Sequence, residues 1–246
     1  MFQRNPLNSQ VLKNKFPEIY REFFSKCQLV VSAPHFFTWA GEYVGYFGGM
    51  MVLQKIPLRI YVGLEFLSNS SASDQITIDP GSKAYSFKER KFVRDQYEPL
   101  AQLRLLEFLE HSFPFSGKTQ PFKIHLLSEV AFGGSGSAGA LCSALATALA
   151  LKEKKILPAD VLKWAGTSSK ELIQGETSEF NLILRLAWKM FAAYRGQETS
   201  GGTVFCSLLN SKYPVFYCLK PSADLNLPLN IGSNYALIDK ISFWGG

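Results

Sequence analysis

Three observations predict an α+β fold for this chain. Apolar residues make up 47% of its 246 residues and charged residues 19%, a composition that can bury a core. Strand-like segments dominate the first half and helix-like segments the second, which favours α+β over a regularly alternating α/β architecture. Every apolar run stops well short of the roughly 20 residues that a bilayer span needs, so a polytopic membrane protein is excluded.

The first part of the chain predicts one helix and several strands. Apolar side chains recur at helical spacing over the first of these segments, with a break near Pro17. The long strand or hairpin that follows later contains Pro57, which marks a bulge or an edge. A polar tip then precedes a strand that ends in a turn. The helix is expected at 11–27, the strands at 28–33, 50–66 and 75–81, and the tip at 68–75.

The second part predicts mainly helices. A helix with proline in its first turn is followed by a strand, a glycine-rich segment and a tightly packed helix on which leucine recurs every four residues. Two further helices, a pair of β-strands and one last strand complete the chain. The helices are expected at 98–110, 140–152, 157–176 and 178–196, and the strands at 122–127, 204–210, 213–220 and from residue 234 onward.

The glycine-rich segment AFGGSGSAG (131–139) is the strongest chemical signal. Its G-x-G-x-x-G pattern lacks the second strand with an acidic end that a dinucleotide-binding fold requires, so that fold is rejected. SGKT at 116–119 is no P-loop, since Ser112 replaces the first glycine and a strand follows. Small residues before a helix N-terminus still suit an anion such as a triphosphate. The alternative is a turn that only lets the helix pack on the sheet.

Three segments resemble motifs of the GHMP small-molecule kinases. SEVAFGGSGSAGALCSALATALAL resembles the second motif of that family, P-x-x-x-G-L-G-S-S-A, with its alanine-rich helix. SAPHFFTWAGEYVGYFGG, upstream, is similar to the first motif, A-P-G-(K/R)-x-x-x-x-G-E-(H/Y). RGQETSGGTVFCS, downstream, resembles the phosphomevalonate-kinase segment Q-G-K-x-G-S-G-x-D-V-A. The three segments occur in the family's order along residues 32–207.

This resemblance implies a fold and a reaction. Residues 1–232 are expected to form a GHMP-kinase N-terminal ATP-binding domain with a ribosomal-protein-like β-α fold, and 233–246 the start of a truncated, ferredoxin-like C-terminal domain. The implied reaction is Mg²⁺- and ATP-dependent phosphoryl transfer to a hydroxyl or phosphate of a small molecule. The third motif favours a mevalonate- or phosphomevalonate-like substrate over a sugar. No membrane or nucleic-acid partner is expected, and a homodimer stays open.

The matched positions carry the family's site residues over to this sequence. Ser137 is also the expected metal ligand, because the family's second serine is Ala138 here. The expected cofactor-binding residues are Phe132, Gly133, Gly134, Ser135, Gly136, Ser137, Ala138 and Gly139; the substrate-binding residues are His35, Glu42, Tyr43 and Gly201; the catalytic residues are Ser200 and Thr203.

Two departures from the family's motifs leave the activity open. The lysine or arginine of the first motif is Phe36, and the aspartate of the third motif is Thr203. Losing both removes the groups that usually neutralise charge and accept the substrate's proton. A catalytically inactive nucleotide- or metabolite-binding protein is therefore the main alternative. The net charge of +6 leaves a nucleic-acid-associated protein as a third hypothesis.

The cysteines and the N-terminus predict a cytoplasmic protein. The four cysteines have no metal-ligand spacing and are expected to be free thiols in a reducing compartment. The first sixteen residues, MFQRNPLNSQVLKNKF, contain no apolar stretch typical of a secretory signal.

Overall fold

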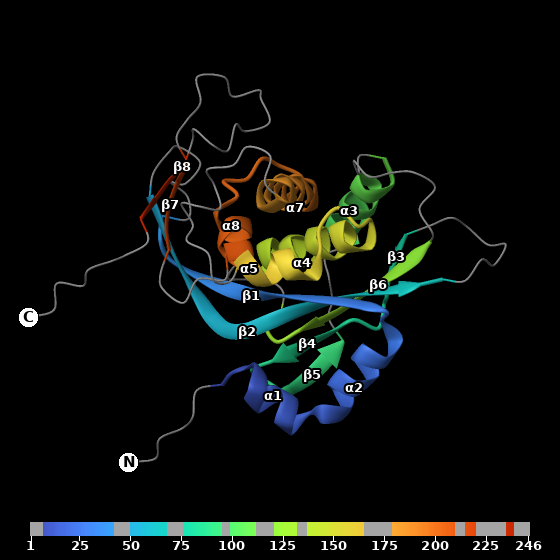
Figure 1. Cartoon of the computed structure of the whole chain (residues 1–246). Coiled ribbons are helices and arrows are strands. Elements are labelled where there is room, and N and C mark those ends of the chain that lie inside the picture. The colour runs from blue at the N-terminus through green and yellow to red at the C-terminus, as the bar shows by residue number, and fades with distance from the viewer. Residues whose placement is uncertain are drawn as a thin grey trace, which may run out of the picture.

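One mixed sheet, covered by helices on both faces, organises the chain (Figure 1). The computed structural model describes residues 7–41, 50–67, 76–94, 99–111, 121–131, 137–164, 179–209, 215–219 and 235–238. Eight strands of these residues form the sheet, in which β5-β4-β6-β2-β7-β8 are neighbours in that order. The predicted α+β class is confirmed. The larger helices pack above the sheet in Figure 1, and the two N-terminal helices pack below it.

The N-terminal segment forms two short helices instead of one. α1 (Ser9–Lys15) begins after Asn8, whose side chain accepts a hydrogen bond from the Val11 N–H at 3.0 Å. α2 (Pro17–Lys26) begins with Pro17 at its first position, where a missing N–H does no harm. The break that the sequence predicts near Pro17 is therefore confirmed.

The two longest strands form the centre of the sheet. β1 (Leu29–Ala40) runs antiparallel to β2 (Met50–Phe66) and extends well beyond the expected strand at 28–33. Pro34 lies opposite Arg59 but Phe36 lies opposite Lys55, so three residues of β2 face a single residue of β1. The predicted bulge at Pro57 is confirmed, because Pro57 is the middle residue of those three.

Shorter strands extend the sheet toward α2. β3 (Thr77–Ile78) lies parallel to β6 (Phe122–Ser128) and ends in the predicted turn, where Asp79 Oδ1 accepts the Gly81 N–H at 3.0 Å. β4 (Lys83–Ser86) and β5 (Lys91–Arg94) form a hairpin that the sequence interpretation missed. The predicted tip at 68–75 lies outside the described residues.

Three predicted helices are confirmed, as α3 (Pro99–His111), α4 (Ser137–Lys152) and α7 (Glu179–Arg195). α5 (Pro158–Trp164) confirms the first part of the helix predicted at 157–176, and the rest of that prediction lies outside the described residues. The strand at 213–220 is confirmed as β7 (Val215–Leu219), and the last strand as β8 (Tyr235–Ile238). β7 pairs with β2 and β8, both antiparallel.

The predicted strand at 204–210 is wrong, because this segment is a helix. α8 (Gly202–Leu209) packs against α4, α7 and β1, with all of its residues buried except Thr203, which is half-buried. Its apolar residues therefore show neither the helical nor the strand period, and periodicity cannot separate the two structures in so short a run. Ser143 Oγ of α4 donates to the Val204 carbonyl at 3.0 Å and ties the two helices together.

The main core lies between the sheet and α4, α7 and α8. Thirteen of the sixteen residues of α4 are buried, so this helix touches protein on every side, and its alanines and glycine let the neighbours come close. In spite of this apolar surface, none of the helices in the described part of the chain is long and apolar enough to cross a membrane. Cys27, Cys142 and Cys206 are free thiols, as expected.

A second apolar cluster holds α1 and α2 against the other face of the sheet. Rings of α2 meet rings of the strands edge to face, as in the pair Tyr20–Tyr61 with centroids 5.8 Å apart. The buried members of this cluster, called the lower cluster below, are Leu12, Tyr20, Phe23, Leu58, Tyr61, Tyr85 and Leu127.

The packing of α4 gives the first testable prediction. Ala144, 1% exposed, has no room for a larger side chain, so Ala144→Leu should lower the free energy of unfolding by roughly 1–3 kcal/mol. Leu162 on α5 is 76% exposed, and Leu162→Ala should change the free energy of unfolding by about 0.5 kcal/mol or less. Urea denaturation of the unmutated protein and of the two variants measures both changes in the free energy of unfolding. Equal stability of the Ala144→Leu protein and the unmutated protein would contradict the packing described.

Candidate functional site

The first turns of α4 and α8 meet at Gly139 and Thr203. A Cβ atom added at Gly139 would lie 2.4 Å from Thr203 Oγ1 and 2.8 Å from Thr203 Cβ. No side chain fits there, and glycine is needed for the two helices to approach this closely. The structure thus brings together one residue from the segment that resembles the second kinase motif and one from the segment that resembles the third.

Two threonine hydroxyls, one at this contact and one in the segment before α8, have unused hydrogen-bonding capacity. Thr203 Oγ1 and Thr199 Oγ1 are buried, and neither has a hydrogen-bond partner among the described residues. A buried hydroxyl without a partner costs about 1–3 kcal/mol, so native structures rarely keep one without a use for it. Free N–H groups at a helix start attract anions, and nearby hydroxyls can add further donors.

The segment before α8 is fixed against α7. Gly201 has a φ of +71°, and a Cβ there would lie 2.6 Å from the Trp188 ring. Trp188 Nε1 donates to the Thr199 carbonyl at 2.9 Å. Ser200 is buried, and its Oγ lies 3.5 Å from Met51 Sδ on β2. The expected catalytic residues Ser200 and Thr203 and the expected substrate residue Gly201 therefore lie at one place.

The structure places only part of the predicted phosphate segment. Ser137 is buried at the first position of α4, Ala138 is half-buried, and Gly139 makes the contact with Thr203. The other expected residues lie outside the described part of the chain: Phe132, Gly133, Gly134, Ser135 and Gly136 of the phosphate segment, and Glu42 and Tyr43 of the first motif.

His35, predicted to bind substrate, is fully buried at the bulge between β1 and β2. Its Nε2 lies 3.2 Å from Ser128 Oγ, which in turn donates to the Val130 carbonyl. Since that hydroxyl proton is used, the imidazole donates through Nε2–H. Burial lowers the pKa of His35 from 6.5 to about 4. A neutral histidine at this place supports the end of β6, and its contact with a substrate stays a prediction.

Phe36, which the motif resemblance aligns with a lysine or arginine of the kinases, is fully buried in the main core. The site therefore has no cationic side chain at that position. Its backbone is fixed in the β1–β2 ladder, where it faces Lys55.

A magnesium ion fits this site only if the nucleotide supplies most of the ligands. The described residues include no group of three or more histidine, cysteine, aspartate or glutamate side chains that could hold a metal. Mg²⁺ usually keeps several waters and binds through phosphate oxygens with one or two protein ligands. The Ser137 hydroxyl, at the start of α4, is the protein ligand that the sequence predicts.

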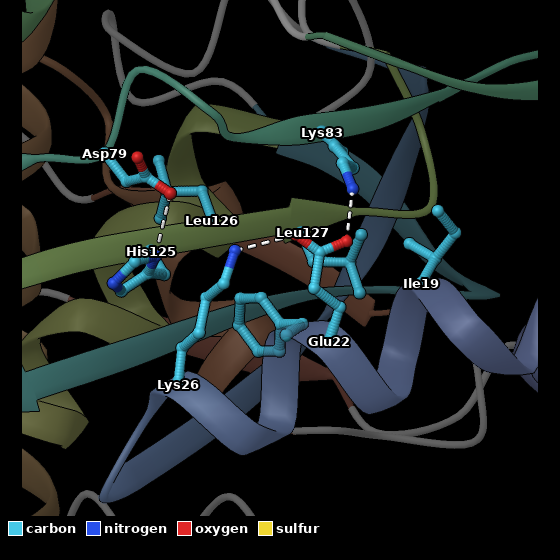
Figure 2. Close-up of a pocket in the computed structure, with 9 residues that line it drawn as sticks. Ile19, Glu22, Lys26, Asp79, Lys83, His125, Leu126 and Leu127 are labelled. Atoms are coloured by element: carbon cyan, nitrogen blue, oxygen red, sulfur yellow. Dashed lines mark hydrogen bonds and ion pairs between the residues drawn. The ribbon is translucent and has the colours of Figure 1, made fainter.

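A pocket on the other face of the sheet holds a network of paired charges (Figure 2). Glu22 of α2 accepts hydrogen bonds from Lys26 at 2.7 Å and Lys83 at 2.8 Å, which lowers the pKa of Glu22 to about 2. His125 of β6 lies between two carboxylates, 2.8 Å from Asp79 and 2.7 Å from Glu65. Glu22 joins α2 to Lys83 of β4, and the ring of His125 lies between Asp79 and Glu65, so the network ties α2 and the β3 turn to the sheet.

Comparison with known proteins gives matches in structure alone. No protein-family model and no curated relative matches the sequence. Mevalonate kinase from methicillin-resistant Staphylococcus aureus aligns over 76% of this chain and 52% of its own, at 17% identity and a TM-score of 0.48. Streptococcus pneumoniae phosphomevalonate kinase, in complex with phosphomevalonate and AMPPNP, aligns over 78% of this chain and 50% of its own. The identity is 20% and the TM-score is 0.41. The D-glycero-D-manno-heptose 1-phosphate kinase from Bacteroides thetaiotaomicron aligns over 78% of this chain and 56% of its own. The identity is 14% and the TM-score is 0.40.

These solved structures are small-molecule kinases, and the chain spans about half the length of each of the three. Their TM-scores lie below 0.5, and at most 20% of the aligned residues are identical. Residue roles in this chain are therefore argued below from its own side chains and from the motif resemblance.

The low pKa of His35 predicts a pH-dependent stability. The unfolded chain takes up a proton near pH 6.5 and the folded protein only near pH 4, so the folded state loses stability as the pH falls through this window. The shift corresponds to about 3 kcal/mol. In His35→Gln this loss between pH 6.5 and 4.5 should disappear, as measured by urea denaturation at several pH values. His111→Gln, at an exposed histidine, is the control and should keep the slope. An unchanged slope in His35→Gln would contradict the assignment.

Proposed function

We propose that this chain binds ATP and belongs to a small-molecule kinase, which transfers the γ-phosphoryl group to a hydroxyl or phosphate of its substrate. The observation that carries the proposal is the contact of Gly139 with Thr203, where two helix starts meet beside unpaired buried hydroxyls. An anion gains there from backbone N–H groups and from the positive ends of both helix dipoles. The glycine-rich segment that leads into α4 would surround the phosphates.

The proposed roles follow the motif positions. Residues 132–139 bind the phosphates, and Ser137 contributes to holding Mg²⁺, which supplies charge neutralisation when bound. Ser200 and Thr203 lie next to the transferred group, and Gly201 lets the chain pass close to the substrate. His35, Glu42 and Tyr43 belong to the proposed substrate side, and a mevalonate- or phosphomevalonate-like molecule is the proposed substrate.

The remaining assignments belong to the same proposal. Residues 1–232 would be the ATP-binding domain and 233–246 the beginning of a second domain. Cytoplasmic location is proposed from the free thiols Cys27, Cys142 and Cys206.

Phosphoryl transfer does not require a carboxylate at position 203. The transition state is loose, and catalysis consists mostly of positioning and of neutralising charge. A threonine hydroxyl can hydrogen-bond the substrate hydroxyl or a phosphate oxygen, but it cannot accept the proton as aspartate does. We therefore expect slow turnover.

Nucleotide binding without catalysis is the second candidate function. It is favoured by one specific observation: the side chains at the family's two charged positions are a fully buried phenylalanine, Phe36, and a neutral threonine, Thr203.

Isothermal titration with MgATP and with a non-hydrolysable analogue tests the binding site. Micromolar to submillimolar affinity is expected for the unmutated protein. Gly139→Ala forces a methyl group against Thr203 and should raise the Kd at least roughly tenfold, because the helix starts must move apart.

Gly63→Ala is the matched control for this titration. It also places a methyl group in close contact, 2.2 Å from Cys27 Sγ, but on the face of the sheet away from the site. It should leave the Kd unchanged in folded protein, as checked by circular dichroism. The assignment of the phosphate site is wrong if Gly139→Ala and Gly63→Ala both bind MgATP as tightly as the unmutated protein. It is also wrong if none of the three proteins binds MgATP.

Thr203→Asp separates the two candidate functions. A restored carboxylate should raise phosphoryl transfer several-fold if the rest of the site is competent, while its negative charge weakens MgATP binding. Turnover is measured as ADP release with mevalonate, phosphomevalonate and a panel of sugars, and Thr203→Asn controls for size. If neither Thr203→Asp nor Thr203→Asn releases ADP although both bind MgATP, the result would favour nucleotide binding without catalysis.

A further inference from the structure

The positive charge of the chain gathers on one surface below the sheet. This surface consists of α1, α2 and the β4–β5 hairpin (residues 83–94), and it is called the basic surface below. It carries nine lysines and arginines and three glutamates, an excess that equals the net charge of +6 of the whole chain. The helices and the hairpin are far apart in the sequence, and the fold places them side by side (Figure 1).

Most of these cations can meet an anion from outside. Seven of the nine are exposed. Lys26 and Lys83 share Glu22, and Lys91 pairs with Glu89. Unneutralised like charges on one surface attract polyanions. Among the residues that the structure describes, the other six cations pair with no carboxylate: Lys13, Lys15, Arg21, Lys88, Arg90 and Arg94.

A row of aromatic rings runs through the basic surface and is exposed at both ends. Phe24 of α2 is 41% exposed, and Phe87 in the hairpin turn is 52% exposed. The inner rings are Tyr20, Phe92 and Tyr85, and each ring of the row contacts the next with centroids 5.4 to 6.5 Å apart. Exposed rings among cations are the usual platforms on which unpaired bases stack.

Protection of a sheet edge explains only part of this charge. β5 is the last strand in the described sheet, and charged side chains on an edge strand discourage pairing with another chain. Lys91 and Arg94 of β5 fit that role. Arg21 lies on α2, and Lys88 and Arg90 lie in the hairpin turn, so these three protect no strand edge.

We propose that the basic surface binds single-stranded nucleic acid, with its lysines and arginines on the phosphates and with Phe24 and Phe87 stacked on bases. A duplex hides the faces of its bases and would leave both rings unused. A bilayer fits less well, because a helix that lies in a membrane needs an apolar face. The apolar faces of α1 and α2 are already buried in the lower cluster.

This binding does not depend on the proposed kinase function. The basic surface lies on the face of the sheet opposite to α4 and α8, where the first turns of the two helices meet (Figure 1). A nucleic acid strand on the basic surface and a nucleotide at the candidate site would therefore bind at separate places.

Fluorescence anisotropy of a labelled oligouridylate of about 12 nucleotides tests the proposal with the whole chain. We expect a Kd of about 1–100 μM at about 50 mM KCl, with strong weakening toward about 200 mM. Contact with about four phosphates gives a slope of about 3 in a plot of log Kd against log salt concentration. A polyglutamate of the same charge should compete at least about tenfold more weakly, since it has no bases to stack.

Charge variants locate the phosphates. Arg21→Gln and Lys88→Gln should each raise the Kd about threefold or more, and each should lower the slope by about 0.7 for the phosphate contact that is lost. Arg185→Gln and Lys189→Gln are matched controls, because they remove the same charge from exposed positions of α7 on the other side of the sheet. They should leave the Kd and the slope unchanged.

Ring variants test stacking. Phe87→Leu keeps an apolar side chain but loses the ring, and it should raise the Kd at least about fivefold. Phe87→Trp keeps an aromatic face and should bind as tightly as the unmutated protein. Since Phe87 is half exposed, circular dichroism should show all of these variants folded.

Several outcomes would overturn the proposal. They are absence of oligouridylate binding at about 50 mM KCl, a slope near zero, equal effects of the α7 controls, an unchanged Kd in Phe87→Leu, and equal competition by polyglutamate. Sedimentation with vesicles of about 30% phosphatidylserine, without binding of oligouridylate, would make the surface a membrane contact instead. Displacement of the oligouridylate by MgATP at matched ionic strength would place it at the candidate site and overturn the proposal too.

Discussion

Because α4 is enclosed by the sheet, α7 and α8, its side chains must be small wherever a neighbour comes close. This constraint explains the alanine-rich sequence of the helix and the glycine at position 139, where α8 approaches too closely for any Cβ. The close packing also lets Ser143 Oγ of α4 donate to the Val204 carbonyl, and this hydrogen bond holds α8 against α4. The candidate site is therefore a product of core packing: the two helix starts lie together because the helices behind them cannot move apart.

The end of β6 is held by polar bonds on both faces of the sheet. On the face of α4, a neutral histidine, His35, holds Ser128 and through it the Val130 carbonyl. On the other face, Glu129 is held by four donors. Buried polar networks of this kind are costly when one member is missing, so each one specifies a single arrangement of the backbone.

The sequence predicted those parts of the fold where local pattern and environment agree. The break at Pro17, the bulge at Pro57 and the amphipathic helices follow from proline geometry and from periodicity. The helix α8 was missed because burial on all sides removes the periodicity. The motif resemblance proposed which residues form the site, but it gave no contacts between them. Neither the closeness of Gly139 and Thr203 nor the burial of His35 is encoded in local spacing.

Neutral side chains at the two charged family positions change the balance between binding and catalysis. A carboxylate at position 203 would repel the phosphates of a bound nucleotide, while a lysine at position 36 would attract them. With Thr203 and Phe36 both terms are absent, and in the proposed site attraction for a triphosphate would come from the helix starts and the hydroxyls. Affinity can survive this exchange, because helix-terminal N–H groups bind anions without charged side chains. The rate of the proposed phosphoryl transfer would suffer more, because no hydroxyl can accept the substrate's proton as a carboxylate does.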